Sequence, residues 1–328
     1  MTAPTEAVPA VSVVVPFRDR RPLLRALLDG LEAQTWTDVE VLLVDDGSTD
    51  GASEEAAGRV VGGRPVRVLQ GDGGGAVAAR QLGVAAARGR ILAFTDSDCV
   101  PDPGWLEAGV AAIEAGADLV QGHTRPAQRR APLERSLWVE DEGLYPTCNV
   151  FYRRDAYDRA GGFDAGIATR YGFRPGARAK GLGFGEDTLL GWRVRRAGRA
   201  VYEPAAVVAH HVFPPDLHDQ LSRTLQAAAF PALIREVPEL RRTFLRRGVF
   251  LGATRPPLYA ALLVGLLGRR RLGAGLLALW AGRHWVGCRR TEPSVRRCAK
   301  ALPVLLATDV VTAGALAVGS VRSRAVVL

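Results

Sequence analysis

The first 122 residues alternate short apolar runs with stretches of helical periodicity, and this alternation constrains the fold most strongly. Such a pattern is typical of βα units whose strands form a largely parallel sheet. We expect strands at 12–15, 41–44, 66–69, 91–95 and 119–121, and helices near 22–31, 76–87 and 105–113. Polar or glycine residues follow the first four strands, so ligand-binding groups should gather along one edge of the sheet.

The fourth of these strands, 91–95, runs directly into Asp96 and Asp98. In an extended segment residues i and i+2 point to the same side, so both carboxylates can meet on one divalent cation. Mg²⁺ and Mn²⁺ prefer such oxygen ligands. The alternative is a simple turn, because Asp and Ser are turn formers and Pro101 and Pro103 follow.

Two neighbouring strand ends carry further candidates. Asp45 and Asp46 follow the second strand, where a carboxylate can accept hydrogen bonds from a nucleoside or can instead cap the next helix. Arg80, on the helix after a glycine-rich run, can reach a diphosphate or can be a solvated surface arginine. The first strand continues into Val-Pro-Phe-Arg rather than a GxGxxG turn, which argues against a Rossmann-type dinucleotide site.

A second set of candidates lies further along the chain. Glu186 and Asp187 begin an expected helix, and a carboxylate there can act as a general base, although helix starts favour acids in any case. A last strand, 206–209, ends at His210, and imidazole is a common metal ligand, although a histidine at a strand end can be purely structural. The glycine-rich residues 167–184 are expected to form a lid.

The C-terminal part of the chain is strongly basic. Residues 235–328 hold seventeen Arg or Lys and four acidic residues, a net charge of +13, whereas the rest of the chain carries −4. With no nucleic-acid-binding motif present, this favours an anionic membrane surface and no nucleic acid as partner. Arg269–Arg271 and Asp309 interrupt the apolar runs, so we expect interfacial helices; a helical subdomain packed on the core is the alternative.

The cysteine pattern and the N-terminal residues indicate the cellular compartment of the protein. Cys99, Cys148, Cys288 and Cys298 form no CxxC pair, and no disulfide framework is expected, which fits a reducing compartment. The N-terminal residues have neither the basic nor the apolar region of a secretory signal. We therefore expect the catalytic part to face the cytoplasm, at the membrane.

The ordered motifs of residues 10–215 resemble glycosyltransferase family 2. The motifs are Val-Val-Val-Pro-Phe, Val-Asp-Asp-Gly-Ser, Ala-Ala-Arg-Gln-Leu-Gly and Phe-Thr-Asp-Ser-Asp, followed by 149–153, 161–164 and 185–187. The resemblance implies an α/β GT-A fold with a central, mostly parallel sheet, a nucleotide-diphosphate sugar donor and inversion at the anomeric carbon. It places a GT-A domain at 10–215, with a donor half at 10–122 and an acceptor half at 123–215, before a helical, membrane-associating region at 216–328.

The resemblance also assigns roles to individual residues. It implies that the donor contacts Pro16, Arg18, Asp46, Arg80 and Asp96, and that Mg²⁺ or Mn²⁺ is held by Asp96, Asp98 and His210. Asp187 is the expected general base with Glu186 as second choice, and Asn149 is expected to touch the acceptor. Trp138 and Trp192 can stack on a sugar or pack in the core.

The function predicted from these residues is an inverting, metal-dependent glycosyltransferase that moves one sugar to an acceptor hydroxyl in cell-envelope or lipid-linked glycan synthesis. The nearest string to the QxxRW motif of processive members is 220–224, with Thr224 in place of Trp, which favours single transfer. One alternative is a nucleotidyltransferase of related fold, which would need a glycine- and arginine-containing loop after the first strand. Another is a catalytically silent sugar-nucleotide-binding protein.

Overall fold

A computed structural model describes residues 7–141, 143–164 and 184–328, so the expected lid lies outside the described residues except for Phe184. The chain forms two compact units. The described part of the N-terminal unit comprises 7–127, 137–141, 143–164 and 184–211, and that of the C-terminal unit comprises 128–136 and 212–328.

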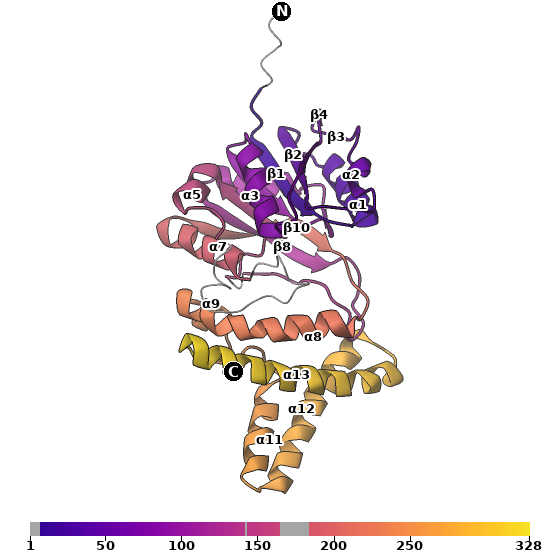
Figure 1. The fold of residues 1–328 in the computed structure, drawn as a ribbon, viewed down its shortest axis with the longest axis vertical. Helices are drawn as coiled ribbons and strands as arrows, with labels where there is room; N and C mark the ends of the chain where they lie inside the picture. Colours follow the sequence, from indigo (N-terminus) through magenta and orange to yellow (C-terminus); the bar gives the residue numbers. More distant parts are fainter. Residues whose placement is uncertain (1–6, 142, 165–183) are drawn as a thin grey trace, which may run out of the picture. The chain divides into compact units, whose positions relative to one another are not determined.

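The N-terminal unit is built on an eight-stranded sheet with the order β5-β2-β1-β6-β9-β8-β10-β7 (Figure 1). The neighbours from β5 to β6 are parallel, whereas β9 runs antiparallel to β6 and β8, and β7 antiparallel to β10. The sheet is therefore mixed, with its parallel part where the sequence predicts it. The strands are β1 (Val11–Phe17), β2 (Val39–Asp45), β5 (Arg67–Gln70), β6 (Ile91–Thr95), β7 (Cys99–Pro101), β8 (Leu119–Pro126), β9 (Asn149–Arg153) and β10 (Ala200–His210), with a separate β3 (Val60–Val61) and β4 (Arg64–Pro65) hairpin.

Helices cover both faces of this sheet. Val13 and Val15 of β1 belong to the same apolar core as the buried leucines of α1 and Trp105 of α4. On the opposite face α3 approaches β1 so closely that a Cβ at Gly83 would lie 2.4 Å from Val14 Cγ1. The helices of this unit are α1 (Arg21–Glu32), α2 (Ala52–Glu55), α3 (Ala76–Ala86), α4 (Trp105–Glu114), α5 (Arg154–Arg159) and α7 (Glu186–Ala197).

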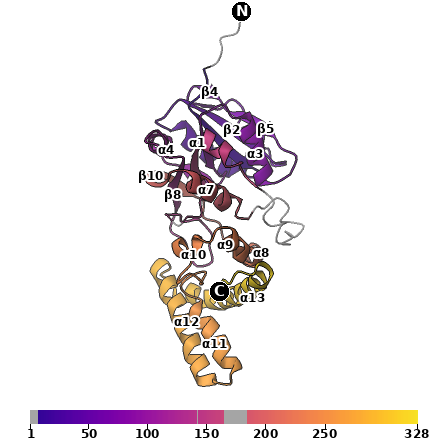
Figure 2. The same ribbon diagram turned by 90° about the vertical axis from the view of Figure 1, so that its left-hand side faces the viewer.

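The C-terminal unit is helical. Its elements are α8 (Leu217–Gln226), the 3-10 turn η1 (Ala227–Ala229), α9 (Phe230–Glu236), α10 (Leu240–Thr243), α11 (Pro256–Leu266), α12 (Arg270–Thr291) and α13 (Val295–Ser323). The long helix α13 packs on α8, η1, α9 and α12, and a Cβ at Gly319 would lie 2.1 Å from the carbonyl oxygen of Ala228. The helices α11 and α12 form a hairpin within this unit (Figure 2).

The apolar character of this unit is concentrated in two places. The α11–α12 hairpin exposes leucines along its length, including Leu263, Leu266 and Leu272, and three exposed arginines, Arg269–Arg271, lie at its turn. Among the described helices, α13 is long and apolar enough to cross a membrane. Asp309 inside α13 is buried, however, and accepts hydrogen bonds from Arg255, Trp280 and His284.

The expectation that the chain has no disulfide is wrong. Cys288 near the end of α12 is bonded to Cys298 in the first turns of α13, with the two Cα atoms 5.8 Å apart. The turn between the two helices brings these residues together, and a spacing of ten residues does not reveal this from sequence. Cys99 and Cys148 of the N-terminal unit are buried and free. The disulfide removes the cysteine argument for a reducing compartment.

Candidate active site

The carboxyl ends of β1, β2 and β6 meet at one edge of the sheet. Phe17 pairs with Asp45, and Val14 pairs with Phe94, so the residues after the three parallel strands are neighbours. The segment after β6 is a turn rather than an extension of the strand, and the Cys99 N–H donates to the Asp96 carbonyl oxygen over 3.0 Å. Within this turn the two carboxylates have different partners: Asp96 pairs with Arg80, and Asp98 pairs with Arg20.

Asp98 lies beside His210, the last residue of β10. The His210 Nε2 is 3.7 Å from the Asp98 Oδ1, and the ligand atoms of Asp98, Cys99 and His210 all lie within 4.8 Å of one another. The other ring nitrogen of His210, Nδ1, lies 2.7 Å from the His211 carbonyl oxygen, which can only accept a hydrogen bond. The Nδ1 therefore carries a proton, and Nε2 is the ring nitrogen that faces the carboxylate. A carboxylate oxygen and the Nε2 of a neutral imidazole are both common ligands of a divalent cation, so this pair can hold one.

Asp96 instead pairs with Arg80 on α3. The Arg80 Nη2 donates to the Asp96 Oδ1 over 2.7 Å, and the Arg80 Nη1 lies 4.0 Å from the Glu186 carboxylate at the start of α7. Burial opposes the charge of Arg80, but the two carboxylates outweigh it and raise the pKa of this guanidinium. Its buried Nε atom has no protein partner. Arg80 is thus a fixed positive charge with one unused donor, rather than the solvated surface arginine of the alternative interpretation.

Glu186 and Asp187 begin α7 after Gly185, which adopts a positive φ of 75°. Glu186 is buried, one of its carboxylate oxygens has no hydrogen-bond partner, and burial raises its pKa. Asp187 is half-buried and accepts a hydrogen bond from the Thr188 N–H over 2.7 Å. Burial, together with the neighbouring Glu186 charge, raises the pKa of Asp187 to about 7. A carboxylate with such a pKa can accept a proton near neutral pH.

The two aspartates after β2 have separate tasks. Asp45 accepts hydrogen bonds from the Ser48 N–H and the Ser53 hydroxyl and thereby holds its own loop. Asp46 is also buried; its Oδ2 accepts from the Gly75 N–H over 3.0 Å, and its Oδ1 has no protein partner. The unused oxygen of Asp46 is available to a hydroxyl or amino group of a ligand.

The other expected donor contacts lie at the end of β1. Pro16 is buried within the strand, opposite Val44. Arg18 follows the strand with an exposed side chain 3.7 Å from the Asp19 carboxylate. The backbone thus places both residues at the same sheet edge as Asp46, while the Arg18 guanidinium extends toward solvent.

The side chain of Asn149, expected to touch the acceptor, is bound by other parts of the fold. Its side chain is fully buried at the start of β9, where the amide accepts from Trp105 and donates to the carbonyl oxygens of His123 and Ala206. All of these hydrogen bonds hold neighbouring strands and α4, so the amide is not offered to an acceptor. The residue is structural in this arrangement.

The two tryptophans differ from each other. Trp192 is buried and donates to the Gly143 carbonyl oxygen, as expected of core packing. Trp138 is 57% exposed, and its ring centroid lies 5.4 Å from that of His123 at an interplanar angle of 86°. Much of the indole is therefore open to solvent, and core packing is wrong for Trp138.

Sequence reasoning missed two residues at this site. Arg20, just before α1, forms an ion pair with Asp98, and Cys99 places its buried sulfur beside the same carboxylate. Neither belongs to a motif that the sequence makes conspicuous. Arg20 is three residues beyond β1, and only the convergence of the β1 and β6 ends brings it to Asp98.

Part of the N-terminal unit is similar in sequence to a known family. Residues 12–166 match the model for glycosyl transferase family 2. Glycosyltransferase AglE of Haloferax volcanii is 32% identical over 174 residues, which cover 48% of this chain and 57% of AglE. The chain spans about half or less of the length of the curated relatives it matches.

Solved structures share the fold at low sequence identity. The mannosyltransferase PcManGT from Pyrobaculum calidifontis, in complex with GDP-Man and Mn²⁺, aligns with a TM-score of 0.54 at 16% identity, covering 94% of this chain and 87% of PcManGT. S. aureus TarS 1–349 in complex with UDP-GlcNAc aligns with a TM-score of 0.50 at 17% identity, covering 96% and 89%. These likenesses confirm the expected GT-A fold. Residues 12–166 are thus similar to glycosyltransferase family 2 in sequence, and the N-terminal unit has the GT-A fold.

Proposed function

We propose that the protein is an inverting, divalent-metal-dependent glycosyltransferase that transfers one sugar from a nucleotide-diphosphate sugar to an acceptor hydroxyl. The observation that carries this proposal is the convergence, at one sheet edge, of the Asp98–His210 pair, the buried Arg80 and the Asp187 carboxylate. Binding of GDP-Man with Mn²⁺ by PcManGT, and of UDP-GlcNAc by TarS, supports a sugar-nucleotide donor.

The proposed mechanism gives each group one task. Asp187 accepts the proton of the acceptor hydroxyl, because burial holds its pKa near that of a neutral solution. Arg80, held by Asp96, stabilises the negative charge that develops on the departing diphosphate. Asp46 binds the nucleoside through its unused carboxylate oxygen. Mg²⁺ or Mn²⁺, held by Asp98 and His210 with Asp96 nearby, would add electrostatic stabilisation of the same charge.

We further propose the division of the chain into a catalytic part at 10–215 and a membrane-associating part at 216–328. The exposed leucines of the α11–α12 hairpin and its three turn arginines support contact with an anionic membrane. An acceptor from cell-envelope or lipid-linked glycan synthesis fits that location. The cytoplasmic face of the cell membrane remains a prediction for the catalytic part.

A thermal-shift screen of sugar nucleotides tests the donor. We expect at least one of UDP-GlcNAc, UDP-glucose and GDP-mannose to raise the melting temperature with Mn²⁺ and to raise it less in EDTA, because specific binding stabilises the folded state. Turnover of the stabilising donor, followed as release of the nucleoside diphosphate, separates an enzyme from a silent binding protein. Formation of a nucleoside triphosphate and a sugar 1-phosphate from the donor and added pyrophosphate would instead identify a nucleotidyltransferase.

A further inference from the structure

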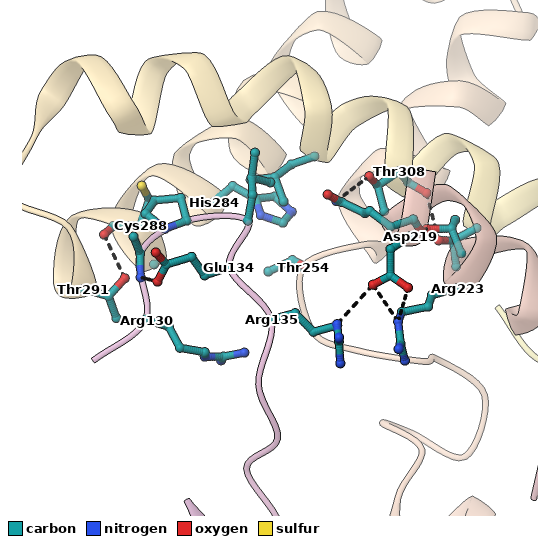
Figure 3. Close-up of a pocket in the computed structure, with 18 of the residues that line it drawn as sticks. Arg130, Glu134, Arg135, Asp219, Arg223, Thr254, His284, Cys288, Thr291 and Thr308 are labelled. Atoms are coloured by element: carbon teal, nitrogen blue, oxygen red, sulfur yellow. Dashed lines mark hydrogen bonds and ion pairs between the residues drawn. The ribbon is translucent and has the colours of Figure 1, made fainter. Parts of the chain in front are cut away.

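A cavity of about 640 Å³ lies within the C-terminal unit, and its lining residues are all outside the candidate active site. Segment 128–136 and residues from α8, α12 and α13 form its walls (Figure 3). This volume is within the range of small-molecule binding sites. The charged side chains at its wall are mostly guanidinium groups: Arg130, Arg135, Arg223, Arg255 and Arg283 line the cavity, against the carboxylates of Glu134, Asp216 and Asp219.

The three carboxylates compensate these arginines only in part. Asp219 is shared by two of them, with the Arg135 Nε at 3.1 Å and the Arg223 Nε at 2.9 Å. Figure 3 shows both guanidinium groups directed at this one carboxylate. Asp216 caps α8 by accepting the N–H groups of residues 218 and 219, and Glu134 accepts the Ala131 N–H over 2.6 Å. The lining carries five guanidinium groups against these three carboxylates, and Asp309, which is not in the lining, pairs with Arg255, so one positive charge remains in excess.

Two of the arginines, Arg130 and Arg283, donate hydrogen bonds to neutral backbone carbonyl groups and to no carboxylate among the described residues. The Arg130 Nη1 donates to the Ser136 carbonyl oxygen at 3.3 Å, and the Arg283 Nη1 donates to the Ala253 carbonyl oxygen at 3.2 Å. Within the described part of the chain, neither guanidinium forms an ion pair with a carboxylate. Both residues line the cavity and are exposed, so their remaining N–H donors are accessible to a ligand. The planar donor fork of arginine matches the oxygens of a phosphate group.

The deeper wall is held in place by a buried network. Asp309 accepts from the Arg255 Nε over 2.8 Å and from the Trp280 Nε1 over 3.0 Å, and its Oδ2 lies 3.2 Å from the His284 Nε2. The Gln220 Nε2 of α8 donates to the Thr308 hydroxyl of α13 over 2.9 Å. These bonds connect the helices around the cavity, so its shape does not depend on a ligand to form.

We propose that this cavity binds a phosphate or diphosphate monoester group through Arg130 and Arg283. The group can be the head of an amphiphilic acceptor, or it can be a free phosphate anion. The apolar chain of an amphiphile would lie on the exposed leucines of α11, the helix that begins just after Arg255 and whose exposed leucines start at Leu262. The role of the ligand as acceptor rests on the proposed transferase activity, whereas the binding site itself does not.

Calorimetric titration of the full-length protein in EDTA tests the site, with inorganic pyrophosphate and farnesyl diphosphate as probes. We expect the double substitution Arg130→Gln/Arg283→Gln to weaken binding of both probes at least about tenfold, because each guanidinium supplies charge-assisted hydrogen bonds. Arg296→Gln, an exposed arginine of the same unit outside the cavity, is the matched control and should leave both affinities unchanged. Unchanged binding in the double variant, or no binding of either probe by the wild type, overturns the proposal.

The two probes also identify the source of the phosphate group. Farnesyl diphosphate that binds at least about tenfold more tightly than pyrophosphate indicates an amphiphile; equal affinities indicate a free anion. Hydrolysis of the donor in Mn²⁺ without an added acceptor does not use the cavity, so release of nucleoside diphosphate under these conditions should be the same in the double variant and the wild type. Absence of this release in the wild type counts against the proposed transferase, whereas a change confined to probe binding concerns the cavity alone.

Discussion

At the scale of single residues, the candidate site depends on groups whose ordinary charge is disturbed by burial. Arg80 is held between Asp96 and Glu186, and Asp187 lies beside the buried Glu186. Holding two acidic groups close together in a buried site costs folding free energy. Such arrangements are therefore typical of functional sites. The motif at 185–187 makes Glu186 and Asp187 conspicuous in the sequence, but only the structure separates a buried partner of Arg80 from a half-buried carboxylate with a raised pKa.

Substitution of Asp187 should change the pH dependence of stability. The pKa of this acid rises from 3.8 in the unfolded chain to about 7 in the fold, so the native state binds the extra proton between these values. Stability of the wild type therefore falls as pH rises from about 4 to about 7, by about 4 kcal/mol at most. We expect Asp187→Asn to remove this pH-dependent loss of stability. The free energy of unfolding of the variant should therefore rise relative to that of the wild type as the pH approaches and passes 7. Denaturant unfolding at pH 5 and pH 8 measures it; parallel pH profiles of both proteins would refute the raised pKa.

The same residue should control turnover. We expect Asp187→Asn to keep donor affinity and to lose turnover by about 10²-fold or more, the effect of removing a general base. The wild-type rate should rise with pH through about 7, because only the deprotonated carboxylate accepts a proton. Glu186→Gln is the matched comparison: if it alone abolishes turnover while Asp187→Asn does not, the base is Glu186.

At the scale of secondary-structure elements, most strands of the sheet could be predicted, whereas β7 and β9 could not. The strands expected at 119–121 and 206–209 lie within β8 and β10, which pair in parallel. The strand at 91–95 coincides with β6 and the helix expected at 76–87 with α3, because apolar periodicity dominates there. The short β7 is formed by Cys99–Pro101, which reads as a turn, and β9 departs from the βα pattern by running antiparallel between β6 and β8. Long-range pairing decides both, and no local signal in the sequence encodes it.

Residues of the candidate site could likewise be predicted where local motifs mark them, but not where contacts distant in the sequence decide. Local motifs indicate Asp46, Asp96, Asp98 and Asp187, which lie at strand or helix ends that the sequence locates. They also indicate Arg80, which lies within α3. The use of Asn149 as a buried bridge between strands depends on three partners distant in the sequence. The Cys288–Cys298 disulfide likewise depends on the turn that follows α12.

The helix α13 supplies a prediction at this scale. Asp309→Ala leaves the donors of Arg255 and Trp280 buried without their acceptor, and removal of one member of a buried ion pair typically costs about 3–5 kcal/mol. We expect a clear fall in the thermal melting temperature of Asp309→Ala, whereas Asp155→Ala, an exposed acid of α5, should change it little. A melting temperature of Asp309→Ala equal to that of the wild type would contradict the network.

At the scale of the whole molecule, charge and function are divided along the chain. The catalytic motifs lie in the part with a net charge of −4, and the +13 of residues 235–328 lies in the helical C-terminal unit. A net positive charge attracts anionic surfaces at low salt. Added salt shortens the Debye length and so weakens this attraction. The proposed membrane contact is therefore electrostatic in part and should depend on salt.

Liposome flotation across a salt series tests this contact. Each arginine near an anionic surface contributes about 1 kcal/mol, so replacement of Arg269, Arg270 and Arg271 by Gln should reduce flotation with anionic vesicles at low salt. The control replaces three exposed arginines of the N-terminal unit, Arg90, Arg159 and Arg199, by Gln. Equal flotation of both triple variants would exclude the hairpin turn as the contact.

The central claim is that a divalent cation at Asp98 and His210 couples the donor to the enzyme, and calorimetric titration with UDP and GDP measures it most directly. We predict that Mn²⁺ raises the affinity of the wild type for at least one of these nucleotides about tenfold or more. Asp98→Asn should abolish this gain, and Asp155→Asn should retain it. An affinity of the wild type that is the same in Mn²⁺ and in EDTA, or a full Mn²⁺ effect in Asp98→Asn, would contradict the account.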